Sequence, residues 1–189
     1  KSVTDPLGNS RSFTYDRNNN IIAVTDREGH TSFYSYDSLN RVKTYTDNNG
    51  FVITVGYDAE SNITSLTDQN NNITTYTYDS LNRRKRMTYP DGKYVEYTYD
   101  KESNVTAVRR TDASVINYQY DTLNRVVSRT MPGGEVYSYT YDKLNRVLTA
   151  TNSNGTITFT YDKLNRVTSE TFDGRTIQYS YNVSGRTQT

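Results

Sequence analysis

Short runs of alternating apolar and polar residues recur along the whole chain. In one of them Val95, Tyr97 and Tyr99 alternate with Glu96 and Thr98, so that the apolar and aromatic side chains share one face. Alternation with a period of two is typical of a half-buried β-strand, whose successive side chains point to opposite faces. The pattern predicts many short strands, and no helical periodicity of useful length competes with it.

A polar break follows each of these strands. Residues 38–40 read Ser-Leu-Asn, residues 41–46 form a second β-prone run, and residues 47–50 read Asp-Asn-Asn-Gly. Gly, Asn and Asp are residues that tight turns favour. We therefore predict an all-β chain whose unit is a β-hairpin of two strands and two turns.

A Tyr-Asp pair marks the register of this unit. The spacing between successive copies is 21 residues six times and then 20 residues twice. The tyrosines are Tyr15, Tyr36, Tyr57, Tyr78, Tyr99, Tyr120, Tyr141, Tyr161 and Tyr181. The residues after them are Asp16, Asp37, Asp58, Asp79, Asp100, Asp121, Asp142 and Asp162, with Asn182 in the ninth copy. Self-similarity at a fixed period predicts a single repeat array over residues 1–189, with about nine repeats of ~21 residues.

Two further positions are tied to each tyrosine. A glycine precedes most tyrosines by seven residues, or by six in one shortened copy. These glycines are Gly8, Gly29, Gly50, Gly92, Gly134, Gly155 and Gly174, and Asn71 and Ala113 replace the glycine in two copies. The fourth residue after Tyr is usually Asn and becomes Gly185 in the last copy, which predicts a left-handed backbone there. Ser61 and Ser103 depart from this pattern, and we expect their turns to differ in geometry.

Composition removes several classes of protein. Only 33% of the residues are hydrophobic, which argues against a thick core, yet 13% are aromatic and the net charge is +1, which argues against disorder. The 22 basic and 21 acidic residues are interleaved, so no basic stripe favours nucleic acid as a partner. The chain has no cysteine for disulfides or thiolate metal sites, and no apolar run approaches the ~20 residues of a membrane span.

The Tyr-Asp-x-x-Asn/Gly-Arg-Val pattern, with an aromatic residue two positions upstream and an Asp-x-x-Gly turn, resembles the YD-repeat family, also called Rhs repeats. The resemblance covers residues 5–189, although the family usually has Gly-Arg where this chain has Asn-Arg, as at Asn40-Arg41. The family includes bacterial Rhs and wall-associated proteins, shell components of Tc toxins, and the teneurins. The resemblance implies hairpins joined edge to edge into a spiralling ribbon, here a segment of a hollow shell.

A second motif of the family has a partial counterpart near the start of the chain. In Rhs shells an Asp-Pro-x-Gly motif ends the repeat region, where an aspartyl autoprotease releases the toxin. Residues 5–8 read Asp-Pro-Leu-Gly, but eight further Tyr-Asp copies follow them, and Asn9 stands where the family usually has Leu. We expect a plain turn with Pro at its favoured second place.

Candidate chemistry is sparse. The single histidine, His30, follows a turn glycine without an arranged partner in the sequence, so we interpret it as a surface turn residue rather than a base or a zinc ligand. The repeated Asp could ligate calcium or form a catalytic pair, but one carboxylate per ~21 residues favours a structural role instead. In that role Asp37 would cap its turn and pair with Arg41, and Asp142 with Arg146. We therefore predict no catalytic, metal or cofactor residues.

The sequence thus predicts a non-enzymatic segment of a secreted or cell-surface shell, from a bacterial source and from a longer protein. The resemblance implies that the shell encloses or presents another part of the polypeptide, such as a C-terminal toxin. The alternative is a module that binds carbohydrate or a cell surface, because rows of Tyr beside Asn and Asp are what sugar-binding surfaces use. Partners would be neighbouring repeats, the enclosed domain, glycans in the alternative, and further copies joined through open sheet edges.

Overall fold

The computed structural model describes residues 1–8, 10–181 and 187–188, and divides the chain into two compact units, residues 1–95 and 96–189. Unit 1 contains β1 (Ser2–Thr4), β2 (Ser10–Tyr15), β3 (Ile21–Thr25), β4 (Thr31–Tyr36), β5 (Val42–Thr46), β6 (Val52–Tyr57), β7 (Ile63–Thr67), β8 (Ile73–Tyr78) and β9 (Arg84–Thr88). The boundary falls within β10 (Tyr94–Tyr99). Unit 2 contains β11 (Val105–Arg109), β12 (Val115–Tyr120), β13 (Val126–Thr130), β14 (Val136–Tyr141), β15 (Val147–Asn152), β16 (Gly155–Tyr161), β17 (Val167–Phe172), β18 (Arg175–Gln178), β19 (Ser180–Tyr181) and β20 (Thr187–Gln188).

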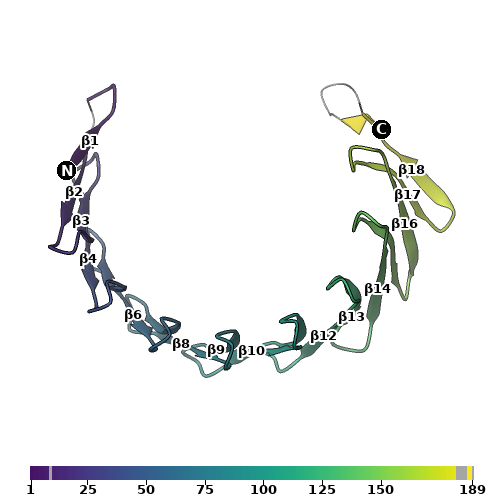
Figure 1. Cartoon of the computed structure of the whole chain (residues 1–189), viewed down its shortest axis with the longest axis horizontal. Coiled ribbons are helices and arrows are strands. Elements are labelled where there is room, and N and C mark those ends of the chain that lie inside the picture. Colours follow the sequence, from purple (N-terminus) through teal and green to yellow (C-terminus); the bar gives the residue numbers. More distant parts are fainter. Residues whose placement is uncertain (9, 182–186, 189) are drawn as a thin grey trace. The chain divides into compact units, whose positions relative to one another are not determined.

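Strands that follow one another in the chain pair side by side and antiparallel, so each unit is a series of hairpins (Figure 1). Strands β1 to β18 are assigned to an antiparallel sheet of 18 strands. The described residues contain no helix. The predicted all-β architecture of tandem hairpins is confirmed. The structure divides residues 1–189, for which the sequence predicts a single repeat array, between the two units.

Each Tyr-Asp hairpin contains a register shift. In β10, Thr98 pairs with Ala107 of β11 while the next residue, Tyr99, pairs with Val105, so Thr106 has no opposite residue. Shifts at the same place occur in the hairpins β2–β3, β4–β5, β6–β7, β8–β9, β12–β13, β14–β15 and β16–β17. One extra residue in a strand is a β-bulge, which bends the strand and increases its twist. The simple alternation of the sequence did not predict this bulge.

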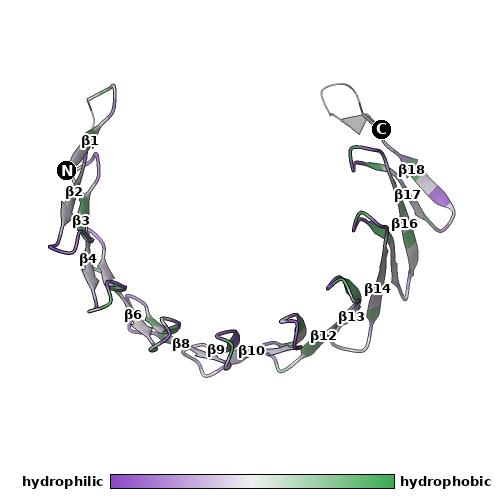
Figure 2. Ribbon diagram, viewed as in Figure 1, coloured by the Kyte–Doolittle hydropathy of each residue, from purple (hydrophilic) through white to green (hydrophobic). Residues whose placement is uncertain are grey.

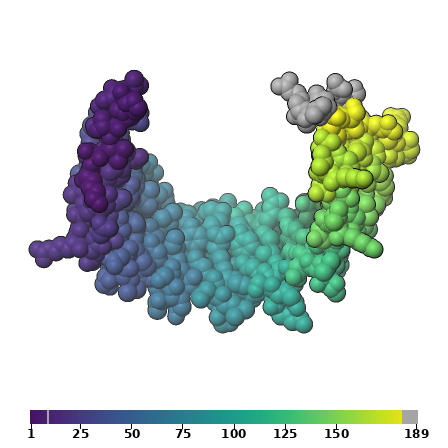
Figure 3. Space-filling model, turned by 45° about the horizontal axis from the view of Figure 1, so that its top comes forward, coloured from purple at the N-terminus to yellow at the C-terminus, as the bar shows by residue number. Residues whose placement is uncertain are grey.

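No described residue is fully buried. The accessible surface is 13074 Å², whereas a globular monomer of this mass exposes about 9,200 Å². Hydrophobic residues lie along the strands of successive hairpins instead of collecting in one block (Figure 2), and side chains of neighbouring hairpins touch across the visible face of each unit (Figure 3). Stability therefore comes from strand pairing and from contacts between adjacent repeats, as in other repeat proteins.

Both kinds of four-residue turn share one backbone design. In the Asp47 turn the N–H of Gly50 donates to the Asp47 carbonyl at 3.1 Å, and the N–H of Asp47 donates to the Phe51 carbonyl at 3.0 Å. Gly50 has a φ of 85°, and Asn40 takes the same place in the other turn with a φ of 60°. This confirms the predicted left-handed position, which Gly and Asn occupy at low cost. Gly185 lies outside the described residues.

The expectation that the Ser61 and Ser103 turns differ in geometry is wrong. Ser61 has a φ of 73° and Ser103 a φ of 72°, close to the values of the Asn copies. The N–H of Ser61 donates to the Asp58 carbonyl at 3.3 Å, and the N–H of Asp58 donates to the Asn62 carbonyl at 3.0 Å, as in the regular turns. The pairing of the flanking strands sets this backbone, and the side chain adapts to it.

The two shortened copies differ because their turn has one residue less, so that two residues lie between the paired ends where the regular turn has three. Asn152 pairs directly with Gly155, and Phe172 with Arg175. A Cβ atom added to Gly155 would lie 2.8 Å from the ring of Phe172. The glycine therefore leaves room for this ring to lie against the backbone of the neighbouring hairpin.

Candidate functional site

The aspartate of each Tyr-Asp pair caps its own turn. One carboxylate oxygen of Asp37, Oδ1, accepts from the N–H groups of Leu39 at 2.9 Å and Arg41 at 3.0 Å. The other, Oδ2, accepts from Arg41 Nε at 2.7 Å. The hydrogen bond from the Arg41 N–H is the main reason that the pKa of Asp37 is lowered. The predicted ion pair of Asp37 with Arg41 is confirmed, and so is that of Asp142 with Arg146.

Most tyrosines of the Tyr-Asp register connect one repeat to the one before it. The hydroxyl of Tyr57 donates to the Val42 carbonyl at 2.8 Å, 15 residues back. Equivalent bonds join Tyr36 to Ile21, Tyr78 to Ile63, Tyr120 to Val105, Tyr141 to Val126, Tyr161 to Val147 and Tyr181 to Val167. Partial burial raises the pKa of several of these phenols, including Tyr78 and Tyr120, because it disfavours the charged form. Each bond holds a ring across the joint between two repeats.

The fifth residue after the tyrosine forms a second connection, to the repeat that follows. Arg41 Nη1 donates to the Asp58 carbonyl at 2.9 Å and to Ser61 Oγ at 3.0 Å. Its guanidinium lies 4.5 Å from the ring centroid of Tyr57. Arg125 and Arg146 make the corresponding contacts with the turns that follow them. A cation over a tyrosine ring is a favourable electrostatic contact.

In some repeats asparagine replaces this arginine. Asn62 Nδ2 donates to Asp58 Oδ2 at 3.0 Å and to Asn82 Oδ1 at 2.9 Å. Asn104 makes the same pair of bonds, to Asp100 and Asn124. Asparagine reaches the next turn but is too short to cover the next ring. The rings of Tyr78 and Tyr120 therefore lack the arginine of the preceding repeat that covers Tyr57 and Tyr141, although Arg84 lies opposite Tyr78 in the sheet.

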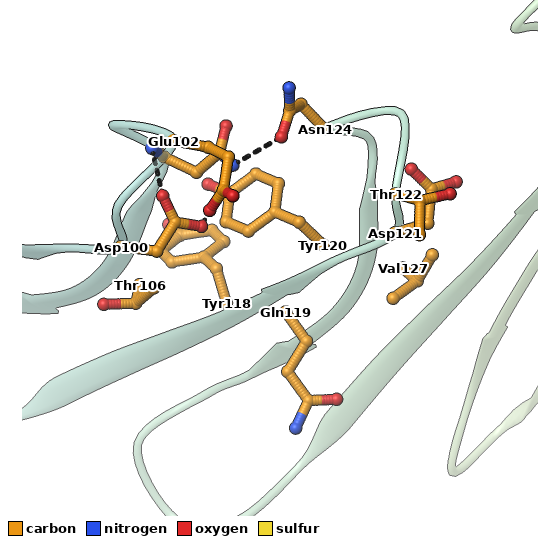
Figure 4. Close-up of a pocket in the computed structure, with 11 residues that line it drawn as sticks. Asp100, Glu102, Thr106, Tyr118, Gln119, Tyr120, Asp121, Thr122, Asn124 and Val127 are labelled. Atoms are coloured by element: carbon orange, nitrogen blue, oxygen red, sulfur yellow. Dashed lines mark hydrogen bonds between the residues drawn. The ribbon is translucent and has the colours of Figure 1, made fainter.

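A groove opens at each of these two asparagine repeats. In unit 2 it has a volume of 660 Å³, and its lining includes Asp100, Glu102, Tyr118, Tyr120 and Asn124. In Figure 4 the carboxylates of Asp100 and Glu102 lie beside the two tyrosine rings, whereas Gln119 points away from them. The site thus combines aromatic faces with negative charge.

Unit 1 contains the same groove, 42 positions earlier in the sequence. Its volume is 500 Å³, and its lining includes Asp58, Glu60, Tyr76, Tyr78 and Asn82. Each of these residues occupies the place in the repeat that its counterpart holds in unit 2. The sequence marked the turns of Ser61 and Ser103 as variants but did not predict the grooves. The co-occurrence of Glu and Asn in those turns was the available signal.

His30 has a neighbour that the sequence analysis missed. Its Nδ1 lies 3.2 Å from Asp26 Oδ2, and ligand atoms of Asp26, Glu28 and His30 lie within 4.8 Å of one another. The expectation that His30 lacks an arranged partner is therefore wrong. Asp26 Oδ1 accepts from the N–H groups of Glu28 and His30, the same capping that Asp47 provides at its own turn.

The Asp-Pro-Leu-Gly segment forms the plain turn that we expected. The N–H of Gly8 donates to the Asp5 carbonyl at 3.0 Å, and the N–H of Leu7 to Asp5 Oδ1 at 2.9 Å. Asp5 also pairs with Arg27 at 3.1 Å. Asn9 lies outside the described residues.

The repeat residues that the sequence singled out fall at joints between strands. Every tyrosine of the Tyr-Asp pairs ends a strand, and the eight aspartates begin the turns that follow. The turn glycines Gly29, Gly50, Gly92, Gly134, Gly155 and Gly174 all have positive φ. Asn182, the residue after Tyr181, lies outside the described residues.

Comparison with known protein families agrees with this pattern. The model of the teneurin YD-shell family matches residues 34–189, and that of the RHS repeat family matches residues 1–31. The chain belongs to the teneurin YD-shell family. The resemblance seen in the Tyr-Asp register is confirmed. No curated protein gives a significant sequence match to this YD-shell chain.

Solved structures of Tc toxin shells have the same fold. A crystal structure of TcdB2-TccC3-Cdc42 matches with a TM-score of 0.69 at 19% identity, over 95% of this chain and 12% of that one. One of TcdB2-TccC3-TEV matches with a TM-score of 0.74 at 16% identity, over 91% and 12%. The Photorhabdus luminescens Tc holotoxin pore matches with a TM-score of 0.68 at 19% identity, over 95% and 12%.

This YD-shell chain therefore spans about an eighth of the solved chains that it matches. Within its described part, no helix has the length and apolar character needed to cross a membrane.

Proposed function

We propose that this chain is a wall segment of a YD-repeat shell, which encloses or presents another part of the same polypeptide, such as a C-terminal toxin. The observation that carries the proposal is the absence of any fully buried residue among those described, in a sheet whose repeats are joined by hydrogen bonds from side chains. Such a sheet has no interior of its own. It suits a wall that separates two compartments.

The role of the repeat residues follows from the same geometry. We propose that the tyrosines and aspartates of the Tyr-Asp pairs, together with the turn glycines, hold the wall together and take no part in catalysis. The same hydrogen bonds recur from joint to joint, as expected of residues that stabilise the structure, whereas a catalytic residue would occupy one unusual site. The proposed function is therefore non-enzymatic.

Location and partners complete the proposal. Membership of the YD-shell family and the likeness to Tc toxin shells support a secreted or cell-surface protein, and we propose a bacterial source. The partners would be the adjoining repeats of one array and the enclosed domain. Further copies would associate through sheet edges, since an unpaired edge can template another strand. Ultracentrifugation of the 189-residue chain would show dimers or larger species.

Limited proteolysis of the full polypeptide tests the enclosure. We expect the C-terminal domain to resist a protease in the intact protein and to be cut when expressed alone. Deleting residues 58–99, which removes two complete repeats from the wall, should expose the domain to the protease. A C-terminal domain that is cut equally fast in the intact protein and alone would refute enclosure.

The grooves favour a second candidate, the binding of carbohydrate. Tyrosine rings beside Asn and carboxylate groups can stack on a sugar face and bond to its hydroxyls. A glycan array probed with the 189-residue chain tests this candidate. Binding to the array would support an adhesion role, and it would not affect the proteolysis result.

A further inference from the structure

The two grooves mark the positions where the chain omits one of its own arginines. The fifth residue after the tyrosine alternates between Asn and Arg over the first six repeats: Asn20, Arg41, Asn62, Arg83, Asn104 and Arg125. At the grooves this residue is Asn62 or Asn104. The arginine repeats therefore show what a groove of this design accepts.

Arg125 illustrates the filled site. Its guanidinium pairs with Asp121 Oδ2 at 2.7 Å, donates to the Asp142 carbonyl at 3.2 Å and to Asn145 Oδ1 at 3.0 Å. It also lies 4.7 Å from the ring centroid of Tyr141. One guanidinium thus satisfies a carboxylate, a turn carbonyl, a side-chain acceptor and an aromatic face.

The unit 2 groove retains the receiving half of this site. Tyr120 takes the place of the covered ring, and the turn that begins at Asp121 provides the carbonyl. Asn124 provides the side-chain oxygen, which accepts one hydrogen bond from Asn104 Nδ2 at 2.8 Å and keeps a second lone pair for a ligand. The missing element is a guanidinium over the ring, because position 104 is Asn instead of Arg. The groove in unit 1 offers Tyr78, the Asp79 turn and Asn82 in the same roles.

The grooves also carry a charge that the arginine repeats lack. The third residue after the tyrosine is Leu39 or Leu123 in arginine repeats, but Glu60 or Glu102 at the grooves. Both glutamates are exposed, and Glu60 forms no ion pair with any described residue. Glu102 pairs with Lys101 at a distance of 3.7 Å, and the side chain of Glu102 is 47% exposed and that of Lys101 89% exposed. Each groove therefore gains a negative charge where it loses a positive one.

We propose that each groove binds the guanidinium of an arginine side chain presented by a partner peptide, with the ring of Tyr78 or Tyr120 as the stacking face and Glu60 or Glu102 as the carboxylate. The planar, forked guanidinium can stack on the ring and donate to several acceptors at once, which an ammonium group cannot do equally well. A neutral sugar would make no ion pair with the added carboxylate, whereas a guanidinium would. This binding is independent of whether the shell encloses a domain.

The first copy of the asparagine repeat provides an internal contrast. It has Asn18 in place of the glutamate, and Asn18 Nδ2 donates to Asn40 Oδ1 at 3.1 Å. Asn20 donates to the same oxygen at 2.8 Å. Without the carboxylate, the ring of Tyr36 should bind the guanidinium less well than Tyr78 and Tyr120 do.

The test uses the 189-residue chain with isotope-labelled tyrosine rings, titrated with N-acetyl-arginine methylamide. The matched neutral probe is the citrulline analogue, which has nearly the same shape without the charge, and a neutral methyl glycoside represents sugars. We expect the arginine probe to shift the ring signals of Tyr78 and Tyr120 and to leave those of Tyr57 and Tyr141 unchanged, since arginines already cover these rings. Raising the salt concentration should weaken the binding.

Two double variants make the test specific. Asn62→Arg with Asn104→Arg copies the arginine repeats, so it should fill both grooves and abolish the shifts while circular dichroism shows an intact fold. Glu60→Gln with Glu102→Gln should weaken binding by about threefold, which is typical of losing one exposed ion pair. Asn70→Arg adds one positive charge at an exposed turn outside the grooves and should bind like the wild type.

Three results would overturn the proposal. They are equal shifts with the arginine and citrulline probes, shifts that survive in the Asn62→Arg, Asn104→Arg variant, and binding of the glycoside without binding of the arginine probe. The last result would assign the grooves to carbohydrate instead.

Discussion

The hydroxyl of the repeat tyrosine offers a direct measure of how strongly neighbouring repeats are coupled. Tyr78→Phe and Tyr120→Phe each remove one hydrogen bond of 2.9 Å, to the carbonyl of Ile63 or Val105, and keep the ring. A hydrogen bond of this kind contributes a net ~0.5–1.5 kcal/mol to stability. Since both rings are only half buried and water can reach the freed carbonyl, we expect a loss of about 1 kcal/mol at each site.

The alanine variants add the loss of the ring. A fully buried aromatic residue costs ~3–5 kcal/mol when it is truncated to alanine. For a half-buried ring about half of that applies, so the loss of the ring costs about 2 kcal/mol. With the hydrogen bond included, Tyr78→Ala and Tyr120→Ala should each lose about 3 kcal/mol. The two sites have the same place in the repeat, and we expect their losses to agree within about 0.5 kcal/mol.

Urea unfolding followed by circular dichroism measures these losses. Tyr76→Phe and Tyr118→Phe are matched controls, because these rings lie two residues earlier on the same strands and their hydroxyls have no hydrogen-bond partner among the described residues. The controls should change stability by less than about 0.3 kcal/mol. Collapse of the chain from one alanine variant alone, or equal losses in variants and controls, would refute the view that repeat joints share the stability.

Three further predictions concern the turns. The native turns lower the pKa of aspartates such as Asp37 and Asp121 below the ordinary value of about 3.9. The stability that these carboxylates contribute is therefore present above pH 4 and should be lost as the pH falls through the lower pKa of the folded state. Urea unfolding between pH 6 and 2 would show this loss. Gly155→Ala should cost about 2–4 kcal/mol, because its Cβ would meet the Phe172 ring at 2.8 Å and its φ is 141°. Gly92→Ala has open space around it and should cost only about 1–2 kcal/mol of backbone strain. Equal shifts of the melting temperature in the two variants would contradict the role of the ring. Ser61→Asn should raise stability by about 0.5 kcal/mol, because Asn tolerates the φ of 73° better and can still accept from Arg41; a lower melting temperature would oppose this.

The sequence predicted those features of the fold that depend on local chemistry. Residue spacing located the strands, and the sharing of one place by Gly and Asn predicted the left-handed turns. The ion pair of Asp37 and Arg41 followed from a separation of four residues across one turn. Each of these features is decided within a single repeat, where neighbouring residues leave the backbone few choices.

Features that involve two repeats could not be derived in the same way. The bond from Tyr57 to the Val42 carbonyl and the reach of Arg41 to Ser61 depend on how far one turn lies from the next. The bulge at Thr106 depends on pairing registers, which simple alternation does not reveal. The Ser61 turn was predicted wrongly because its side chain was given more weight than the strand pairing that fixes its backbone.

None of the residues that the structure describes is fully buried, and this has a thermodynamic consequence. The heat capacity change of unfolding and the denaturant m-value both scale with the surface that unfolding newly exposes. A sheet that already exposes 13074 Å² in its native state has less surface left to expose than a globular chain of the same length. Its free energy of unfolding should therefore change more gently with temperature and with urea. Such a sheet would keep a similar stability over a wider range of temperature than a domain built around a core.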